Sequence, residues 1–162
     1  MEINGTKLLF ARVRNVKPPF CETNLSAGID FYVPDDFNGG KPCEVASGKD
    51  VFVPSGIKVH VPRGYVLIAT EETEVASSCT AIKKAFGHVK PTEMDSILKV
   101  DCRAIDEHSQ GEVLLHVVNI GCVCGYITPG TKLARMLLVP VGCVPACEVT
   151  EARLWDDETS LG

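Results

Sequence analysis

The sequence predicts an all-β protein with a sandwich, jelly-roll or barrel architecture and one short helical segment. Two observations support this prediction. Short runs of β-branched and apolar residues recur along the chain, and turns rich in glycine and proline separate them at short intervals. Residues 57–61 also alternate between apolar and polar side chains, as a half-buried strand does. With 162 residues, 45% of them hydrophobic, the chain is long enough for one domain with its own core.

The expected strands share a short length, an enrichment in β-branched residues and flanking turn residues. In chain order they span 7–14, 29–33, 50–53, 58–61, 65–70, 113–119, 132–140 and 147–151. The turn residues Pro54, Ser55 and Gly56 are expected to separate the third of these strands from the fourth.

Residues 75–89 differ from this pattern of short strands because they contain alanines, two lysines and apolar residues at helical spacing. A short helix is expected here, with Ser77 or Ser78 as its cap. Residues 90–101 are expected to form a loop and then a strand. The apolar face of the helix would contain Val75, Cys79, Ile82 and Phe86.

Charge and hydropathy exclude two classes of partner. Sixteen basic and 21 acidic residues give a net charge of −5, whereas nucleic-acid binding requires a basic surface. A small basic pocket for one nucleotide remains compatible with this charge. The chain contains no signal-peptide pattern and no apolar run near the roughly 18 residues that span a membrane. We therefore expect a soluble, cytoplasmic protein.

Eight cysteines are present, and we interpret them as reduced, buried side chains that act as small hydrophobic residues. Cys122 with Cys124 and Cys143 with Cys147 are the alternative, as four zinc ligands. Their spacing lacks the usual pattern of paired ligands around a turn, so no metal site is expected from the cysteines.

Four segments, in order, resemble the trimeric dUTPase family. They are residues 26–31 (first motif, typically Ala-Gly-Tyr-Asp-Leu), 53–65 (central hairpin), 104–113 (third motif, Val-Ile-Asp-x-x-Tyr-x-Gly-Glu) and 129–140 (fourth motif). The resemblance implies a dUTPase-like jelly roll over residues 1–151, with an insertion at about 76–100, and a short acidic tail over 152–162. It also implies a homotrimer whose pockets are built from neighbouring subunits.

The activity implied by the resemblance is hydrolysis of dUTP to dUMP and pyrophosphate, with Mg²⁺ and an activated water. Asp106 matches the third-motif aspartate that contacts the sugar and activates water. The alternative is a turn aspartate that caps its own backbone. Asp30 matches the first-motif aspartate near the phosphates and metal, and its alternative is an ion pair.

The phosphate-binding positions depart from the family pattern. Where the second motif has a basic residue and a serine, this chain has Thr70-Glu71-Glu72-Thr73-Glu74, whose carboxylates would repel phosphate. An alternative alignment supplies Ser77 and Ser78 but places Ala76 at the basic position. The family's glycine-rich C-terminal arm with its arginine has no counterpart in this sequence.

The base and sugar positions also differ. Ser109 replaces the tyrosine that packs under deoxyribose, and Arg103 replaces a glycine, so that it either enters the pocket or points to solvent. Arg135 replaces the fourth-motif glutamine and would meet phosphate or an acidic neighbour. Lys83 and Lys84 in the insertion are either new cations for the ligand or part of a solvated basic face. The other expected ligand-binding residues are Ala104, Ile105, His108 and Gln110.

Three functions remain open. The first is a dUTPase-fold protein that binds a nucleotide or a nucleotide signal without hydrolysing dUTP; a viral protein that sequesters such a signal in the host-cell cytoplasm is one form of it. The second is an active, divergent dUTP diphosphatase, which would need Mg²⁺. The third is a trimeric scaffold without a ligand.

Overall fold

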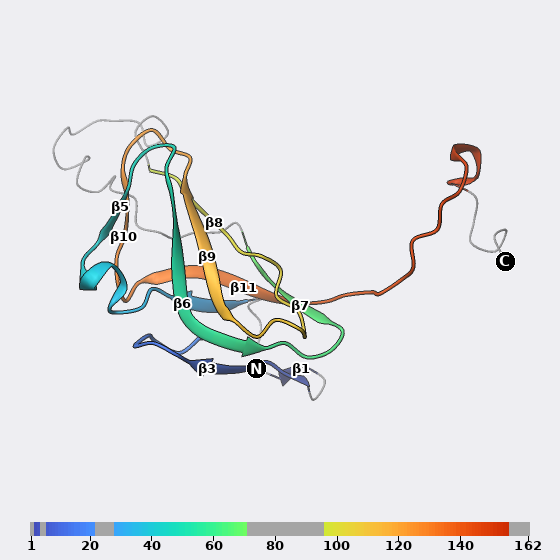
Figure 1. The fold of residues 1–162 in the computed structure, drawn as a ribbon, viewed down its shortest axis with the longest axis horizontal. Coiled ribbons are helices and arrows are strands. Elements are labelled where there is room, and N and C mark those ends of the chain that lie inside the picture. The colour runs from blue at the N-terminus through green and yellow to red at the C-terminus, as the bar shows by residue number, and fades with distance from the viewer. Residues whose placement is uncertain (1, 4–5, 22–27, 71–95, 156–162) are drawn as a thin grey trace.

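The structure is a computed structural model that describes residues 2–3, 6–21, 28–70 and 96–155 (Figure 1). Two antiparallel sheets dominate it, a four-stranded sheet in the order β3-β6-β9-β8 and a three-stranded sheet in the order β4-β11-β7. Two further two-stranded sheets pair β1 with β2 and β10 with β5. The predicted all-β jelly-roll sandwich is confirmed. The helix expected over 75–89 lies outside the described residues.

The strands run as follows: β1 Glu2–Ile3, β2 Thr6–Lys7, β3 Leu9–Arg12, β4 Ile29–Tyr32, β5 Cys43–Val45, β6 Asp50–His60, β7 Tyr65–Ala69, β8 Leu98–Asp101, β9 Glu112–Asn119, β10 Gly125–Ile127 and β11 Lys132–Pro140. Two short 3₁₀ helices, η1 (Phe37–Gly40) and η2 (Glu151–Arg153), are the helical elements of the described ranges. Neither is long and apolar enough to cross a membrane.

The core lies between the two larger sheets and follows the alternation of each strand. In β9, Val113, Leu115 and Val117 are buried, whereas Leu114 is half exposed on the opposite face. Phe31 of β4 and Met136 of β11 are fully buried in the same cluster. Side chains on alternate positions of facing sheets therefore fill one continuous core.

β6 is one continuous strand, so the predicted break at Pro54, Ser55 and Gly56 is wrong. The five residues of β6 from Pro54 to Lys58 oppose three residues of β9, from Leu114 to Glu112, so β6 has two residues in excess. The extra residues of β6 form a bulge in its pairing with β9, and Gly56 in this bulge has a φ of +74°. Because the excess is even, the same face of β6 points to the core on both sides of the bulge.

Several boundaries differ from the prediction. The expected first strand is divided between β2 and β3, and the short strands β1, β5 and β10 were not predicted. The strand after the loop of 90–101 is present as β8. The strand expected at 147–151 is wrong, because residues 141–150 form no strand in the described structure.

Residues 141–155 instead lead away from the sheets as an exposed arm (Figure 1). Val144 is 84% exposed and Trp155 is 87% exposed. No described strand pairs with the arm. Residues 147–151 therefore do not form a strand in spite of their β-rich composition.

The seven described cysteines are free thiols, and three of them, Cys122, Cys143 and Cys147, are exposed. The other four are partly exposed. The interpretation as buried small hydrophobic residues is wrong for the three exposed cysteines, whereas Cys43 and Cys102 pack partly buried against the core. Cys79 lies outside the described residues.

Candidate functional site

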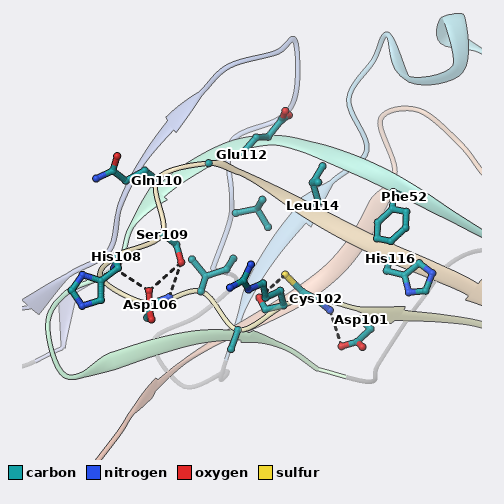
Figure 2. A pocket seen from close by; sticks show the side chains of 15 residues that line it. Phe52, Asp101, Cys102, Asp106, His108, Ser109, Gln110, Glu112, Leu114 and His116 are labelled. Atoms are coloured by element: carbon teal, nitrogen blue, oxygen red, sulfur yellow. Dashed lines mark hydrogen bonds between the residues drawn. The ribbon is translucent and has the colours of Figure 1, made fainter. Parts of the chain in front are cut away.

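A cleft of about 860 Å³ lies along the segment that joins β8 to β9 and along the outer face of β9 (Figure 2). Seven residues expected from the sequence line it: Arg103, Ala104, Ile105, Asp106, His108, Ser109 and Gln110. The cleft is within the size range of small-molecule sites, and its walls combine apolar and polar side chains. We call it the hairpin cleft.

Asp106 is held by a closed set of hydrogen bonds in its own turn. The backbone N–H of His108 donates to Asp106 Oδ1 at 3.0 Å, and the Ser109 hydroxyl donates to the same oxygen at 3.2 Å. The backbone N–H of Asp106 donates in turn to Ser109 Oγ at 3.2 Å. Both bonds to the carboxylate end on Oδ1, so Oδ2 receives neither of them. Asp106 therefore caps its own backbone, as its alternative predicted, and it also lines the cleft.

The same turn sets the ionisation of Asp106. The hydrogen bond from the His108 backbone, helped by the one from Ser109, lowers the pKa of the Asp106 carboxyl below its ordinary value. The side chain is a carboxylate throughout the neutral range. At this position it can orient a water molecule by accepting a hydrogen bond from it. Its low pKa makes it a weak base, so it is poorly suited to removing a proton from that water.

Ile105 fixes the position of this turn. Its backbone exchanges two hydrogen bonds with Leu67 of β7, at 2.8 and 3.0 Å, and its side chain is buried. The cleft segment continues into β9 of the four-stranded sheet while Ile105 is tied to the three-stranded sheet. The turn is therefore supported by both halves of the sandwich, although Ile105 meets the core more than the cleft.

Glu112 supports the other end of the segment. Its carboxylate accepts from Arg14 Nε at 2.7 Å and Arg14 Nη2 at 3.1 Å, and from the backbone N–H of Gly56 at 2.8 Å. The hydrogen bond from Arg14, together with that from Gly56, lowers the pKa of Glu112 although partial burial opposes the shift. This carboxylate joins the cleft to the bulge of β6.

Asp30 and Arg135 lie together, outside the set of residues that line the hairpin cleft. Arg135 Nε lies 3.1 Å from Asp30 Oδ1, and Lys132 Nζ lies 3.4 Å from the same oxygen. The pairing of β4 with β11 brings them together, because Asp30 is the register partner of Arg135. Asp30 thus forms the ion pair that was its alternative, and Arg135 meets an acidic neighbour. Lys83 and Lys84 lie outside the described residues.

The described residues contain no preassembled cluster of metal ligands. No three His, Cys, Asp or Glu side chains in the described ranges are grouped as metal ligands. The carboxylate of Asp30, the family's counterpart near the metal, is occupied by Arg135 and Lys132. Mg²⁺ prefers one or two free carboxylates together with substrate phosphates. We therefore assign no step of a reaction to the metal.

Sequence reasoning missed the far end of the cleft. Phe52 and His116 line it opposite the Asp106 turn, and Cys102 lies between these ends (Figure 2). Phe52 and His116 belong to different strands, 64 positions apart in the sequence, and become neighbours only through the pairing of β6 with β9. The one signal in the sequence is a histidine at an outward position of an alternating strand.

Comparisons with known proteins agree with this architecture. The chain is 27% identical over 136 residues to a deoxyuridine 5'-triphosphate nucleotidohydrolase of Hamiltonella defensa, which covers 83% of this chain and 78% of that protein. No protein-family model matches the chain.

Two solved structures of phage enzymes are similar in fold. A mutant dUTPase from phage phi11 of S. aureus, described with a structural Mg(II) ion, has a TM-score of 0.65 and 16% identity, over 92% of this chain and 100% of that one. A mutant dUTPase from phage 80alpha has a TM-score of 0.67 and 15% identity, over 98% and 99% of the two chains. The chain has the dUTPase fold, and the resemblance to the dUTPase family is confirmed.

Proposed function

We propose that this protein is a divergent dUTP diphosphatase that binds the nucleoside of dUTP in the hairpin cleft and releases dUMP and pyrophosphate. The observation that supports it most strongly is Asp106, an ionised carboxylate held at the cleft wall by hydrogen bonds from His108 and Ser109. The named relatives support the reaction, since the curated relative is a deoxyuridine triphosphate nucleotidohydrolase. This was the second of the three functions that the sequence left open.

In the proposed reaction, Asp106 orients the attacking water. Oδ1 is fixed by His108 and Ser109, so Oδ2 is the oxygen that accepts a hydrogen from the water. The water oxygen forms a bond to the α-phosphorus of dUTP, and the bond from this phosphorus to the oxygen of the leaving pyrophosphate breaks. One proton of the water passes to solvent. Because the geometry is set before the substrate arrives, little reorganisation is required in the transition state.

A second candidate function, nucleotide binding without hydrolysis, is favoured by a different observation. Asp30 is paired with Arg135 and Lys132, so this carboxylate is neutralised by the chain itself. The replacement of the usual tyrosine by Ser109, whose hydroxyl serves the Asp106 turn, also removes a contact to the sugar. Assembly as a homotrimer belongs to both proposals, because the resemblance implies a site completed by neighbouring subunits.

The test follows pyrophosphate release from dUTP in the presence of Mg²⁺, for the wild type and for Asp106→Asn. Asparagine retains an acceptor oxygen for His108 and Ser109 but loses the charge that orients water. We expect release to fall by about 10²- to 10⁴-fold in the variant. Thermal melting of the two proteins in the absence of nucleotide should agree, which separates a chemical effect from a folding effect.

The same assay distinguishes the alternatives. If dUTP raises the melting temperature and is recovered intact, the protein binds without hydrolysis; ligand at about 100 times its dissociation constant stabilises by about 2.7 kcal/mol. If no nucleotide raises the melting temperature, both proposals fail and a scaffold without ligand is favoured. Release at the same rate in Asp106→Asn would remove Asp106 from the reaction.

A further inference from the structure

We propose that Cys143 and Cys147 on the exposed arm form a thiol–disulfide exchange site, which a small disulfide such as oxidised glutathione closes into a reversible disulfide within one chain. The inference is independent of the proposed function, because neither cysteine lines the hairpin cleft. Both cysteines were expected to be buried, and both are free and exposed.

The arm leaves both thiols accessible. Val144, beside Cys143, is 84% exposed, and no described strand pairs with the arm. Among the described residues, no backbone hydrogen bond ties residues 142–149 to the sheets. Thiol–disulfide exchange requires access to the reacting sulfurs, and this part of the chain gives a small disulfide that access.

The arm has to bend before the two sulfurs can meet, and its sequence favours that bend. In an extended chain, Cα atoms four residues apart are separated by at most about 13–14 Å, whereas a disulfide requires about 4.4–6.8 Å. Pro145 stands at the second position of a β-turn over residues 144–147, where proline is favoured. Closure through this turn would shorten the span from Cys143 to Cys147 by up to about 8 Å.

The proposed chemistry consists of two exchanges. The thiolate of one arm cysteine attacks a sulfur of oxidised glutathione, the S–S bond of that molecule breaks, and one glutathione leaves. The thiolate of the other cysteine then attacks the protein sulfur of the mixed disulfide, the bond between the two arm sulfurs forms, and the second glutathione leaves. The two cysteines lose two protons and two electrons, and oxidised glutathione gains them as two thiols. Excess reduced glutathione reverses both steps.

The short separation favours closure within one chain over a link between chains. Once glutathione is attached to one arm cysteine, the other lies four positions away on the same segment. Its effective concentration is on the order of millimolar, well above a micromolar concentration of other chains. The mixed disulfide is therefore expected to resolve within the arm.

Cys122 and Cys124 form a comparison pair that lacks this freedom. The side chain of Asn119 donates to the carbonyl of Val123 between them at 2.7 Å, which fixes the local backbone. The Cys124 sulfur lies 3.1 Å from Glu44 Oε1, and this hydrogen bond raises the pKa of the Cys124 thiol. The reactive thiolate is therefore scarce at Cys124.

The experiment equilibrates the whole chain in its native state with mixtures of oxidised and reduced glutathione. Acid stops the exchange, N-ethylmaleimide blocks the remaining thiols, and tryptic peptides are weighed without reduction. Residues 136–153 form one tryptic peptide that contains both arm cysteines and no other, and residues 104–132 form the peptide that contains Cys122 and Cys124.

In excess oxidised glutathione, we expect the peptide of residues 136–153 to lose two hydrogen atoms in most molecules, and dithiothreitol to restore them. The internal disulfide of the comparison peptide should be at least about fivefold less abundant. Cys147→Ser should stop at the first exchange and keep glutathione on Cys143. Cys122→Ser is the matched control and should close the arm as the wild type does.

Each other outcome overturns the inference. An arm that stays reduced in the native protein at every glutathione ratio, but closes in urea, is covered in the folded protein. Disulfide-linked dimers on a non-reducing gel that disappear in Cys143→Ser would show a link between chains instead. Glutathione that remains attached to the wild-type arm without closure would show that the arm does not bend at Pro145. None of these results changes the test of Asp106.

Discussion

Arg14 and Glu112, 98 positions apart in the chain, form a two-pronged ion pair with N–O distances of 2.7 and 3.1 Å. Glu112 Oε1 also accepts from the backbone N–H of Gly56 at 2.8 Å. One carboxylate therefore joins the segment after β3, the bulge of β6 and the start of β9. Because Glu112 also lines the hairpin cleft, the support of the site depends on residues that are distant from Asp106 in sequence.

Removal of the Glu112 carboxylate should destabilise the fold. In Glu112→Ala the buried N–H of Gly56 loses its acceptor, and we expect a loss of about 1–3 kcal/mol in the free energy of unfolding. Glu112→Gln keeps an acceptor oxygen for Gly56 and should lose less. Urea denaturation of both variants measures the difference. Equal losses in the two variants would indicate that charge, and not the Gly56 contact, is what matters.

Acid should weaken the fold through the same group. The hydrogen bond from Arg14 lowers the pKa of Glu112 in the folded state below the ordinary value of 4.5. Its contribution to stability is therefore present above that ordinary value and is lost as pH falls through the folded pKa. Between about pH 5 and pH 3 the wild type should lose more stability than Glu112→Gln. Parallel stability curves for the two proteins would contradict this prediction.

The bulge of β6 requires glycine at position 56. A Cβ atom there would lie 2.8 Å from Val16 Cγ1, and the φ of +74° is unfavourable for other residues. We expect Gly56→Ala to cost roughly 2–5 kcal/mol. Gly64→Ala is the matched control, because Gly64 has a φ of +82° but no atom within 4 Å of the added Cβ. Its cost should be about 1 kcal/mol from the backbone alone. Similar melting temperatures for the two variants would exclude the contact with Val16.

Asp30 should matter more to stability than Arg135. Asp30→Asn leaves Arg135 and Lys132 without their shared carboxylate, at a cost of about 1–3 kcal/mol. Arg135→Gln, which introduces the residue usual in the fourth motif, leaves Asp30 with Lys132 and should cost less. Guanidinium denaturation compares the two variants. A larger loss in Arg135→Gln would mean that the other contacts of the arginine dominate.

Cys102 should react slowly although it lines the cleft. Burial, with a smaller effect of the Asp101 carboxylate, raises the pKa of the Cys102 thiol to about 11. The reactive thiolate is therefore scarce at neutral pH. In a time course with iodoacetamide, mass spectrometry of peptides should show modification of Cys122 and Cys143 before Cys102. Labelling of Cys102 as rapid as that of Cys143 would contradict the raised pKa.

The sequence predicted those strands whose own residues determine them. β4, β7 and β11 are rich in β-branched or apolar residues and are bounded by turn residues, and they lie within one residue of the expected ranges. β5 and β10 have three residues each, too few for an alternating pattern to emerge. The bulge of β6 was read as a turn because proline and glycine are typical of both, and only pairing with β9 distinguishes them.

The site was predicted in part for the same reason. The cleft segment from Arg103 to Gln110 is continuous in sequence, so a resemblance to one motif located all of it. The pair of Phe52 and His116 depends on the register of two strands. The ion pair of Asp30 with Arg135 likewise depends on the register of β4 with β11. Composition and spacing along one strand contain no information on its partner.

The exposed arm gives this protein a separate optical signal. Trp155 is the one tryptophan in the sequence, and it is 87% exposed. It belongs to the arm of residues 141–155, which leads away from the sheets (Figure 1). An indole already surrounded by water changes its emission little when the sandwich unfolds, but shifts it when an apolar surface covers the ring. Circular dichroism therefore reports the unfolding of the sheets, whereas a shift in tryptophan emission reports the burial of the arm against another surface.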